Sequence, residues 1–263
     1  MNYLSTQKLT LAVKIAILSF ISLFASDAFA LLTAKANHDH ITVDSFYHGG
    51  TVSIRGESDP GTELIIKVVS EEGTHQTLRK KGKVAGLLWM TVGELDVDHV
   101  PNFYEVFSTK KIDDMLHMDE MDKYSIGFSA LQKHALMNVA TEEEKSKWFN
   151  EFIKFKAESN LYSASAGNIT IAQNDGKQNY YILTEWPYQA PPGNYTVTVY
   201  AVKGGKVVET ATSSVMVEQV GAVKALATMA RSNGALYGLI SILAAIGAGF
   251  GVGLIFRKSE GAH

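Results

Sequence analysis

The sequence contains no cysteine. This absence excludes disulfide bonds, thiolate-bound metals, a lipid-modified cysteine and covalently attached haem. A domain of this protein that folds outside the cytoplasm is therefore held together by its apolar core and its hydrogen bonds, without covalent cross-links.

The signature motifs of several enzyme classes are also absent. The chain has no GxSxG elbow, no HExxH pair, no phosphate-binding loop and no glycine-rich dinucleotide turn. Pairs of Asp and Glu occur, but a catalytic role for them depends on geometry that a sequence does not give. We therefore expect a protein that is not an enzyme and that uses no cofactor.

An excess of positive charge is lacking as well. The formal net charge is −3, and the residues between the two long apolar segments described next carry about −5. Taken as a whole, such a chain is not attracted to nucleic acid or to anionic lipid. Nucleic acid is therefore not among the expected partners.

The longest run without charge is residues 235–256, near the C-terminal end. A helix rises about 1.5 Å per residue, so a helix of this length crosses the roughly 30 Å hydrocarbon core of a bilayer. Arg257 and Lys258 follow at once, and basic residues hold a helix end on the cytoplasmic side. The pattern predicts a transmembrane helix at 235–256, a cytoplasmic tail at 257–263 and an ectodomain on the other side of the membrane.

The other apolar segment is residues 1–30. Two lysines precede its apolar centre, and the small residues Ala28 and Ala30 occupy the two positions that a signal peptidase reads. This layout predicts a secretory signal peptide that is cleaved after Ala30. Because Leu31 and the next leucine extend the apolar run, an uncleaved first membrane helix is the alternative. Both interpretations place the ectodomain outside the cytoplasm.

Two β-rich parts, residues 31–110 and 161–219, are expected between these segments. Short stretches there alternate apolar and polar residues and are separated by Gly, Pro and Asp: 41–43, 51–56, 63–69, 168–172, 179–183 and 195–202. Such a pattern is typical of antiparallel strands, and Gly204-Gly205 between two alternating runs indicates a hairpin. We predict a mainly β fold, with an immunoglobulin-like β-sandwich ectodomain interrupted by a helical insert.

Residues 111–160 form the predicted helical insert. Thr141 and Glu144 match a capping box. Apolar residues then recur at steps of three and four, which predicts a helix of about eighteen residues packed against a sheet. These residues are Trp148, Phe149, Phe152, Ile153 and Phe155. Further along, residues 220–234 are predicted to be a juxtamembrane linker.

The predicted membrane helix contains Gly247, Gly249, Gly251 and Gly253. Gly247 with Gly251, and Gly249 with Gly253, have the GxxxG spacing that lets two helices approach closely. The pattern favours association with a copy of the same chain or with a larger membrane protein. Glycine is also tolerated in membrane helices without such a role, and that alternative stays open.

A basic cluster is a candidate site for an anion or a partner. It consists of Arg79, Lys80, Lys81 and Lys83, with glycines beside it. Guanidinium and ammonium groups complement oxyanions, and glycines expose backbone amides. A solvated strand edge would have the same composition, because lysines also protect sheet edges.

Two sets of residues are candidate metal ligands. Imidazoles suit zinc or copper(II), and thioethers suit copper(I). The first set is His38, His40 and His48, and the second is Met115, His117, Met118 and Met121. A mobile start of the mature chain and an amphipathic helix explain the two sets equally well, because ligand-type residues are commoner than metal sites.

Several segments together resemble an uncharacterised family of bacterial, mostly proteobacterial, transmembrane proteins with a signal peptide and one C-terminal helix. The residues that carry this resemblance are 46–50 (FYHGG), 54–56 (IRG), 79–82 (RKKG), 86–90 (GLLWM), 100–104 (VPNFY), 236–238 (LYG) and 256–258 (FRK). The resemblance implies a single-pass protein of the bacterial inner membrane, with its β-rich domain in the periplasm. It also implies an association with sulfite-exporter-type permeases, and it supplies no catalytic residues.

The sequence thus leads to two functional hypotheses. In the first, the protein is a non-enzymatic accessory protein that binds or stabilises a membrane partner, such as a sulfite-exporter-type permease. In the second, it is a tethered periplasmic protein that binds a solute, an oxyanion or a metal. The partner contacts of the first hypothesis lie in the C-terminal helix and in the basic cluster.

Overall fold

The computed structural model describes residues 31–71, 75–84, 86–174 and 176–257, with the side chains of residues 80 and 255–257 excepted. The chain divides into two compact units, residues 1–31 and 32–263, and the elements below belong to the second. The predicted signal peptide at 1–30 and most of the predicted tail, residues 258–263, lie outside the described residues.

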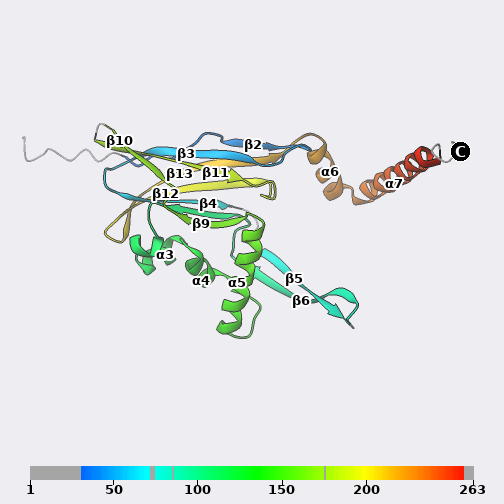
Figure 1. Cartoon of the computed structure of the whole chain (residues 1–263), viewed down its shortest axis with the longest axis horizontal. Coiled ribbons are helices and arrows are strands. Elements are labelled where there is room, and N and C mark those ends of the chain that lie inside the picture. The colour runs from blue at the N-terminus through cyan, green and yellow to red at the C-terminus, as the bar shows by residue number, and fades with distance from the viewer. Residues whose placement is uncertain (1–30, 72–74, 85, 175, 258–263) are drawn as a thin grey trace, which may run out of the picture. The chain divides into compact units, whose positions relative to one another are not determined.

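Strands make up most of the regular structure (Figure 1). In chain order they are β1 (Lys35–Ala36), β2 (His40–Val43), β3 (Gly50–Ser58), β4 (Glu63–Ser70), β5 (His75–Val84), β6 (Leu88–Asp98), β7 (Tyr104–Ser108), β8 (Leu136–Met137), β9 (Tyr162–Ala166), β10 (Thr170–Asn174), β11 (Lys177–Trp186), β12 (Gly193–Lys203) and β13 (Lys206–Gln219). The helices are α2 (Ile112–Met115), α3 (Met118–Tyr124), α4 (Phe128–His134), α5 (Glu142–Glu158), α6 (Gly221–Ser232) and α7 (Gly234–Arg257).

Two of the sheets combine strands from both predicted β-rich parts. The four-stranded sheet has the order β1-β3-β11-β10, and the six-stranded sheet has the order β2-β13-β12-β4-β7-β9. β3 pairs with β11, and β4 pairs with β12, over long sequence separations. Residues 31–110 and 161–219 therefore build the same sheets jointly.

The first core lies between these two sheets. Ile54 of β3 and Ile182 of β11 contribute to it from the four-stranded sheet, and Ile66 of β4 contributes from the six-stranded sheet. Buried side chains alternate with more exposed ones along β11, as expected for a strand with one buried face. Along β4 most side chains are buried, which means that both faces of the six-stranded sheet are covered.

The helical insert covers the second face of the six-stranded sheet. Ile65 of β4 and Tyr200 of β12 pack there with Phe149 and Phe152 of α5, in what we call the second core. Burial of α5 against the sheet agrees with the apolar spacing in its sequence, although Phe155 is half exposed.

The N-terminus of α5 follows the predicted capping pattern only in part. Thr141 Oγ1 accepts a hydrogen bond from the Glu144 amide, as a capping box requires. The Glu144 carboxylate accepts instead from the amide of Ala140, one residue before the cap. The helix has 17 residues, close to the predicted length.

β5 and β6 form a long antiparallel ribbon (Figure 1). At its base β6 also pairs with the short β8. Leu95 and Val97 anchor this base in the second core. Residues 86–94 are all exposed. The outer half of the ribbon is therefore stabilised mainly by its own cross-strand pairs.

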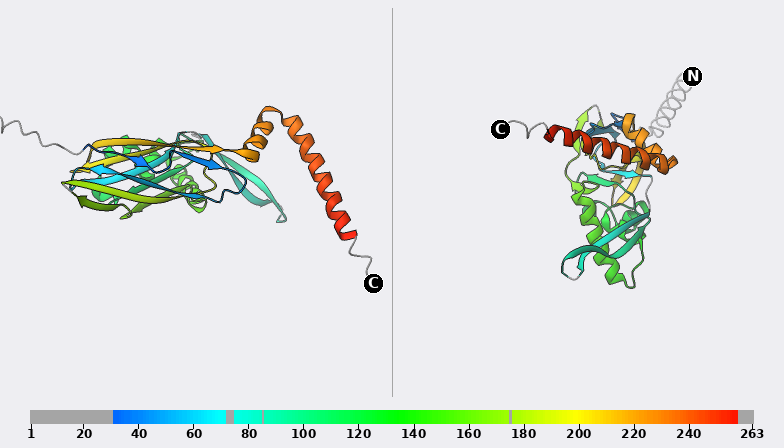
Figure 2. Two further views of the ribbon diagram at one scale, coloured as in Figure 1. Left: turned by 90° about the horizontal axis from the view of Figure 1, so that it is seen from above. Right: turned by 90° about the vertical axis from the view of Figure 1, so that its right-hand side faces the viewer.

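The C-terminal part of the chain is helical. The predicted linker folds as α6, which ends at Ser232, and α7 begins two residues later (Figure 2). Within the described ranges, one helix is long and apolar enough to cross a membrane, and its span is Gly234–Leu254. This agrees with the predicted membrane helix, so the chain is mostly β with one C-terminal apolar helix.

Candidate functional site

The basic cluster lies on β5 and does not form a closed anion pocket. Arg79 Nε donates to Glu94 Oε1 at 3.0 Å, and Lys81 Nζ donates to Thr91 Oγ1 at 2.9 Å. The Lys83 ammonium lies 5.5 Å from the centroid of the Trp89 ring. The side chain of Lys80 lies outside the described residues. The three described side chains therefore contact β6 across the ribbon.

The three histidines of the first metal set do not share an element. His38 precedes β2, and His40 lies in β2 with its Nε2 3.3 Å from the Glu218 carboxylate. His48 precedes β3, and its Nδ1 donates to the carbonyl of Phe46. No group of three or more His, Asp or Glu side chains in the part of the chain that is described is placed to hold a metal ion.

The methionines of the second set point in different directions. Met115 and Met121 are buried in the second core, whereas Met118 is 70% exposed. The imidazole of His117 packs against Gly205, because a Cβ placed on that glycine would lie 2.3 Å from Nε2. The buried thioethers contribute to packing, and the assignment of a copper site here stays a prediction.

The four glycines of the two GxxxG pairs in α7 leave open space beside the helix. A Cβ placed on any of them would meet no described atom within 4 Å. A hollow on the helix surface is lined by Ile246, Gly249, Phe250, Gly253 and Leu254. Gly247 and Gly251 do not line it, so the two GxxxG pairs lie beside different surfaces.

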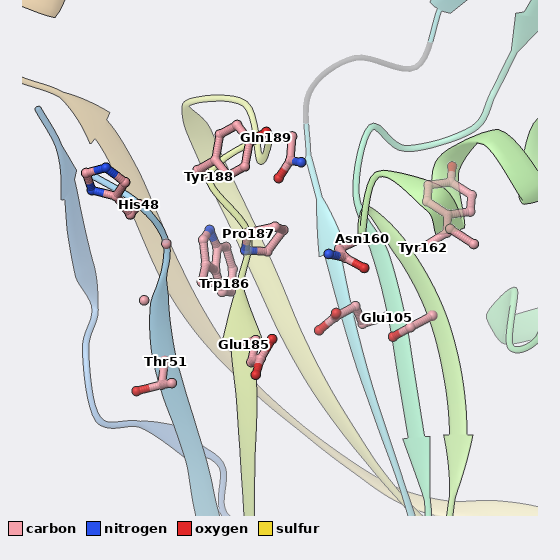
Figure 3. Close-up of a pocket in the computed structure, with 14 residues that line it drawn as sticks. His48, Thr51, Glu105, Asn160, Tyr162, Glu185, Trp186, Pro187, Tyr188 and Gln189 are labelled. Carbon is pink, nitrogen blue, oxygen red and sulfur yellow. The ribbon is translucent and has the colours of Figure 1, made fainter. Parts of the chain in front are cut away.

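A polar cavity of about 670 Å³ lies between the ends of β3 and β11 and the strands β7 and β9 (Figure 3). Figure 3 shows the carboxylates of Glu105 and Glu185 turned toward the same space from facing strands. The other labelled side chains of its wall are His48, Thr51, Asn160, Tyr162, Trp186, Pro187, Tyr188 and Gln189. The cavity is open to solvent and contains several hydrogen-bond acceptors.

Glu105 is the chemically unusual residue of this cavity. It is only 6% exposed, and Thr184 Oγ1 donates to its Oε2 at 2.8 Å, which joins β11 to β7. Burial raises the pKa of Glu105 to about 7, and the nearby Glu185 charge adds to this effect, while hydrogen bonds from Thr184 and Ser163 oppose it. Glu105 therefore changes charge near neutral pH, in contrast to an exposed carboxyl.

No pattern in the sequence predicts this cavity as a site. The sequence contains one local indication of it, which is the single carboxylate of Glu105 within the mostly apolar stretch that forms β7. Every residue of β7 is buried. A buried charge-bearing side chain with a shifted pKa is a common feature of functional sites, and it also occurs in purely structural networks. Its partner Thr184 is 79 residues further along the chain, so only the folded structure brings the two together.

The fold and α7 define the class to which the protein belongs: β-rich proteins with a C-terminal helix able to cross a membrane. The chain belongs to the family described as "Putative transmembrane protein (Alph_Pro_TM)", whose model matches residues 31–258. This match confirms the resemblance to an uncharacterised transmembrane family. None of the curated proteins that were compared matches the chain.

Proposed function

We propose that the protein is a non-enzymatic, membrane-anchored accessory protein that binds or stabilises a partner within the membrane. The hollow on α7 over Gly249 and Gly253 is the observation that carries this proposal. Lipid tails are as apolar as leucine, so helices associate in membranes mainly where small residues allow close packing. A partner helix fits this hollow, with Ile246, Phe250 and Leu254 as its walls.

The family resemblance makes a sulfite-exporter-type permease the first partner to test, and a second copy of the chain the next. The β-rich domain would then lie in the periplasm as an immunoglobulin-like sandwich. Two sheets around one apolar core support this fold. Arg257, at the end of α7, supports a cytoplasmic C-terminus.

The test is a pulldown of the tagged full-length protein from its native membrane in mild detergent, followed by mass spectrometry. We expect a permease or another membrane protein in near-stoichiometric amount with the wild-type chain. Gly249→Leu with Gly253→Leu fills the hollow and should abolish the capture.

The matched control is Gly247→Leu with Gly251→Leu. This pair adds the same volume roughly 200° around the helix, since each residue turns the helix by about 100°. It should leave the capture intact. Recovery of the wild-type chain alone, without a partner or a second copy, would refute the accessory function.

A second candidate function, a tethered solute-binding protein, is favoured by the cavity around Glu105. The carboxyls of Glu105 and Glu185 and the amide of Asn160 suit a cationic or hydroxyl-rich solute better than an oxyanion. A solute that binds only the folded state raises its unfolding temperature. Thermal stabilisation by such a solute that is lost in the Glu105→Ala variant would support this function. If amines, polyols and metal ions all fail to raise the unfolding temperature, the accessory function is the one that remains.

A further inference from the structure

The outer half of the β5–β6 ribbon, described at residues 81–84 and 86–92, has two chemically different faces. The register pairs Val84 with Leu88 and Gly82 with Met90, and it pairs Lys83 with Trp89 and Lys81 with Thr91. Cross-strand partners share a face of an antiparallel pair, and successive residues alternate between faces. One face is therefore apolar, and the opposite face carries the lysines with Trp89.

The apolar face is exposed to solvent. Leu88 is 65% exposed and Met90 is 51% exposed, and Leu87 at the turn reaches 85%. Val92 lies over Gly82, because a Cβ placed on that glycine would be 2.9 Å from its Cγ2. A two-stranded ribbon gains little stability by itself, so an apolar face of this kind indicates a surface that is covered in use.

The opposite face is cationic. Lys81 and Lys83 lie on it, and Trp89 is the cross-strand partner of Lys83, whose ammonium lies 5.5 Å from the centroid of the ring. No acidic residue occurs in the sequence from residue 80 to residue 93. The first carboxylate further along β6, Glu94, is paired with Arg79 at 3.0 Å. The charge of the outer half is therefore positive, in contrast to the net negative charge of the whole chain.

We propose that the outer half of the β5–β6 ribbon docks on an anionic lipid bilayer. Its apolar face enters the boundary between headgroups and acyl chains, and Lys81 and Lys83 reach the lipid phosphates. Amphipathic segments that lie in a membrane interface combine an apolar face with basic residues, whose stems extend along the apolar region. Trp89 suits this position because its ring has an apolar body and a polar N–H.

A bilayer fits this surface better than a second copy of the ribbon. If two copies paired through their apolar faces, their four described lysines would lie close together, and like charges repel one another. At an anionic bilayer, the lipid headgroups would instead neutralise each lysine. Membrane anchoring by α7 also keeps lipid at a high effective concentration around the ribbon. This inference involves a different surface from the hollow on α7 and does not depend on a helix partner.

The test uses the absence of cysteine, because a single introduced cysteine is a unique labelling site. The full-length Leu87→Cys protein carries an environment-sensitive fluorophore and is reconstituted in phosphatidylcholine vesicles with and without phosphatidylglycerol. Nitroxide-labelled lipid then quenches fluorophores that lie in the bilayer interface. The matched control is Asn174→Cys, at the exposed end of the β10–β11 hairpin.

We expect quenching at position 87 in anionic vesicles and none at position 174. Replacing Lys81 or Lys83 by Gln should weaken docking about fivefold each, which is the attraction of one basic side chain to an anionic surface. A fluorophore at position 87 that stays in water in both kinds of vesicle would overturn the proposal.

Two other outcomes would overturn it in favour of a different occupant. Protection of position 87 that appears only in native membranes, and not in lipid vesicles, would indicate a protein partner. Protection that rises with the protein-to-lipid ratio, without quenching by labelled lipid, would indicate a second copy of the chain.

Discussion

Replacement of Glu105 by Gln should stabilise the protein at alkaline pH and leave it unchanged at acid pH. The pKa of Glu105 is about 7 in the folded protein, against an ordinary value of 4.5. Between these values the folded state binds more protons than the unfolded state, so the stability of the wild-type protein falls as the pH rises through this range. The difference corresponds to about 3 kcal/mol in the free energy of unfolding.

The amide side chain of the Glu105→Gln protein would keep the hydrogen bond from Thr184 and would carry no charge. At pH 8 this variant should therefore be more stable than the wild type by up to about 3 kcal/mol, and at pH 4 the two should be equal. For a denaturant dependence of about 2 kcal/mol per molar urea, the midpoints at pH 8 differ by roughly 1.5 M.

The assay is urea unfolding of the full-length protein in mild detergent, followed by tryptophan fluorescence. Trp186 reports on the first core because it is buried between Phe103 and Tyr195, with ring centroids at 5.2 and 4.7 Å. Glu185→Gln is the comparison variant, since Glu185 lines the same cavity but is exposed. Loss of its charge lowers the pKa of Glu105 less than loss of burial would, so it should raise the stability at pH 8 by less than Glu105→Gln does. A stability difference between Glu105→Gln and the wild type that does not change with pH would refute the argument from burial.

Two further predictions concern the stability of the fold. Gly56→Ala should destabilise the protein by about 3 kcal/mol, because its Cβ would lie 1.9 Å from the Thr33 carbonyl oxygen, whereas Gly93→Ala, whose Cβ meets nothing within 4 Å, should change the urea midpoint little. Thr141→Ala removes the cap of α5 and should cost about 1 kcal/mol, and Thr141→Ser should restore most of this loss. Unchanged urea midpoints for Gly56→Ala or Thr141→Ala would contradict the corresponding contact.

The elements that the sequence predicted well are those whose pattern is local. β4, β12 and α7 each show a regular alternation or a continuous apolar run, and burial follows it in the two strands. The β5–β6 ribbon was not predicted as an element, because its basic run and its apolar run do not alternate within one strand. Its two faces emerge only when the register places Lys83 beside Trp89.

The arrangement of the sheets depends on pairings that no local pattern encodes. One partner of β3 is β11, whose residues lie more than a hundred positions further along the chain. The cavity around Glu105 depends on the same pairings, because β11 brings Thr184 to β7. The assignments of the basic cluster, of the helix glycines and of the metal ligands stay predictions.

The position of β13 has a consequence for the order of folding. β13 lies inside the six-stranded sheet, between β12 and β2, and it is the last strand before the C-terminal helices. A growing chain thus exposes the open edges of β12 and β2 until residue 219 has arrived, and open edges are prone to wrong pairing. The six-stranded sheet is complete only after almost the whole chain before α7 has been synthesised. Closure of the sheet and insertion of the apolar helix α7 into a membrane should therefore occur close together in time.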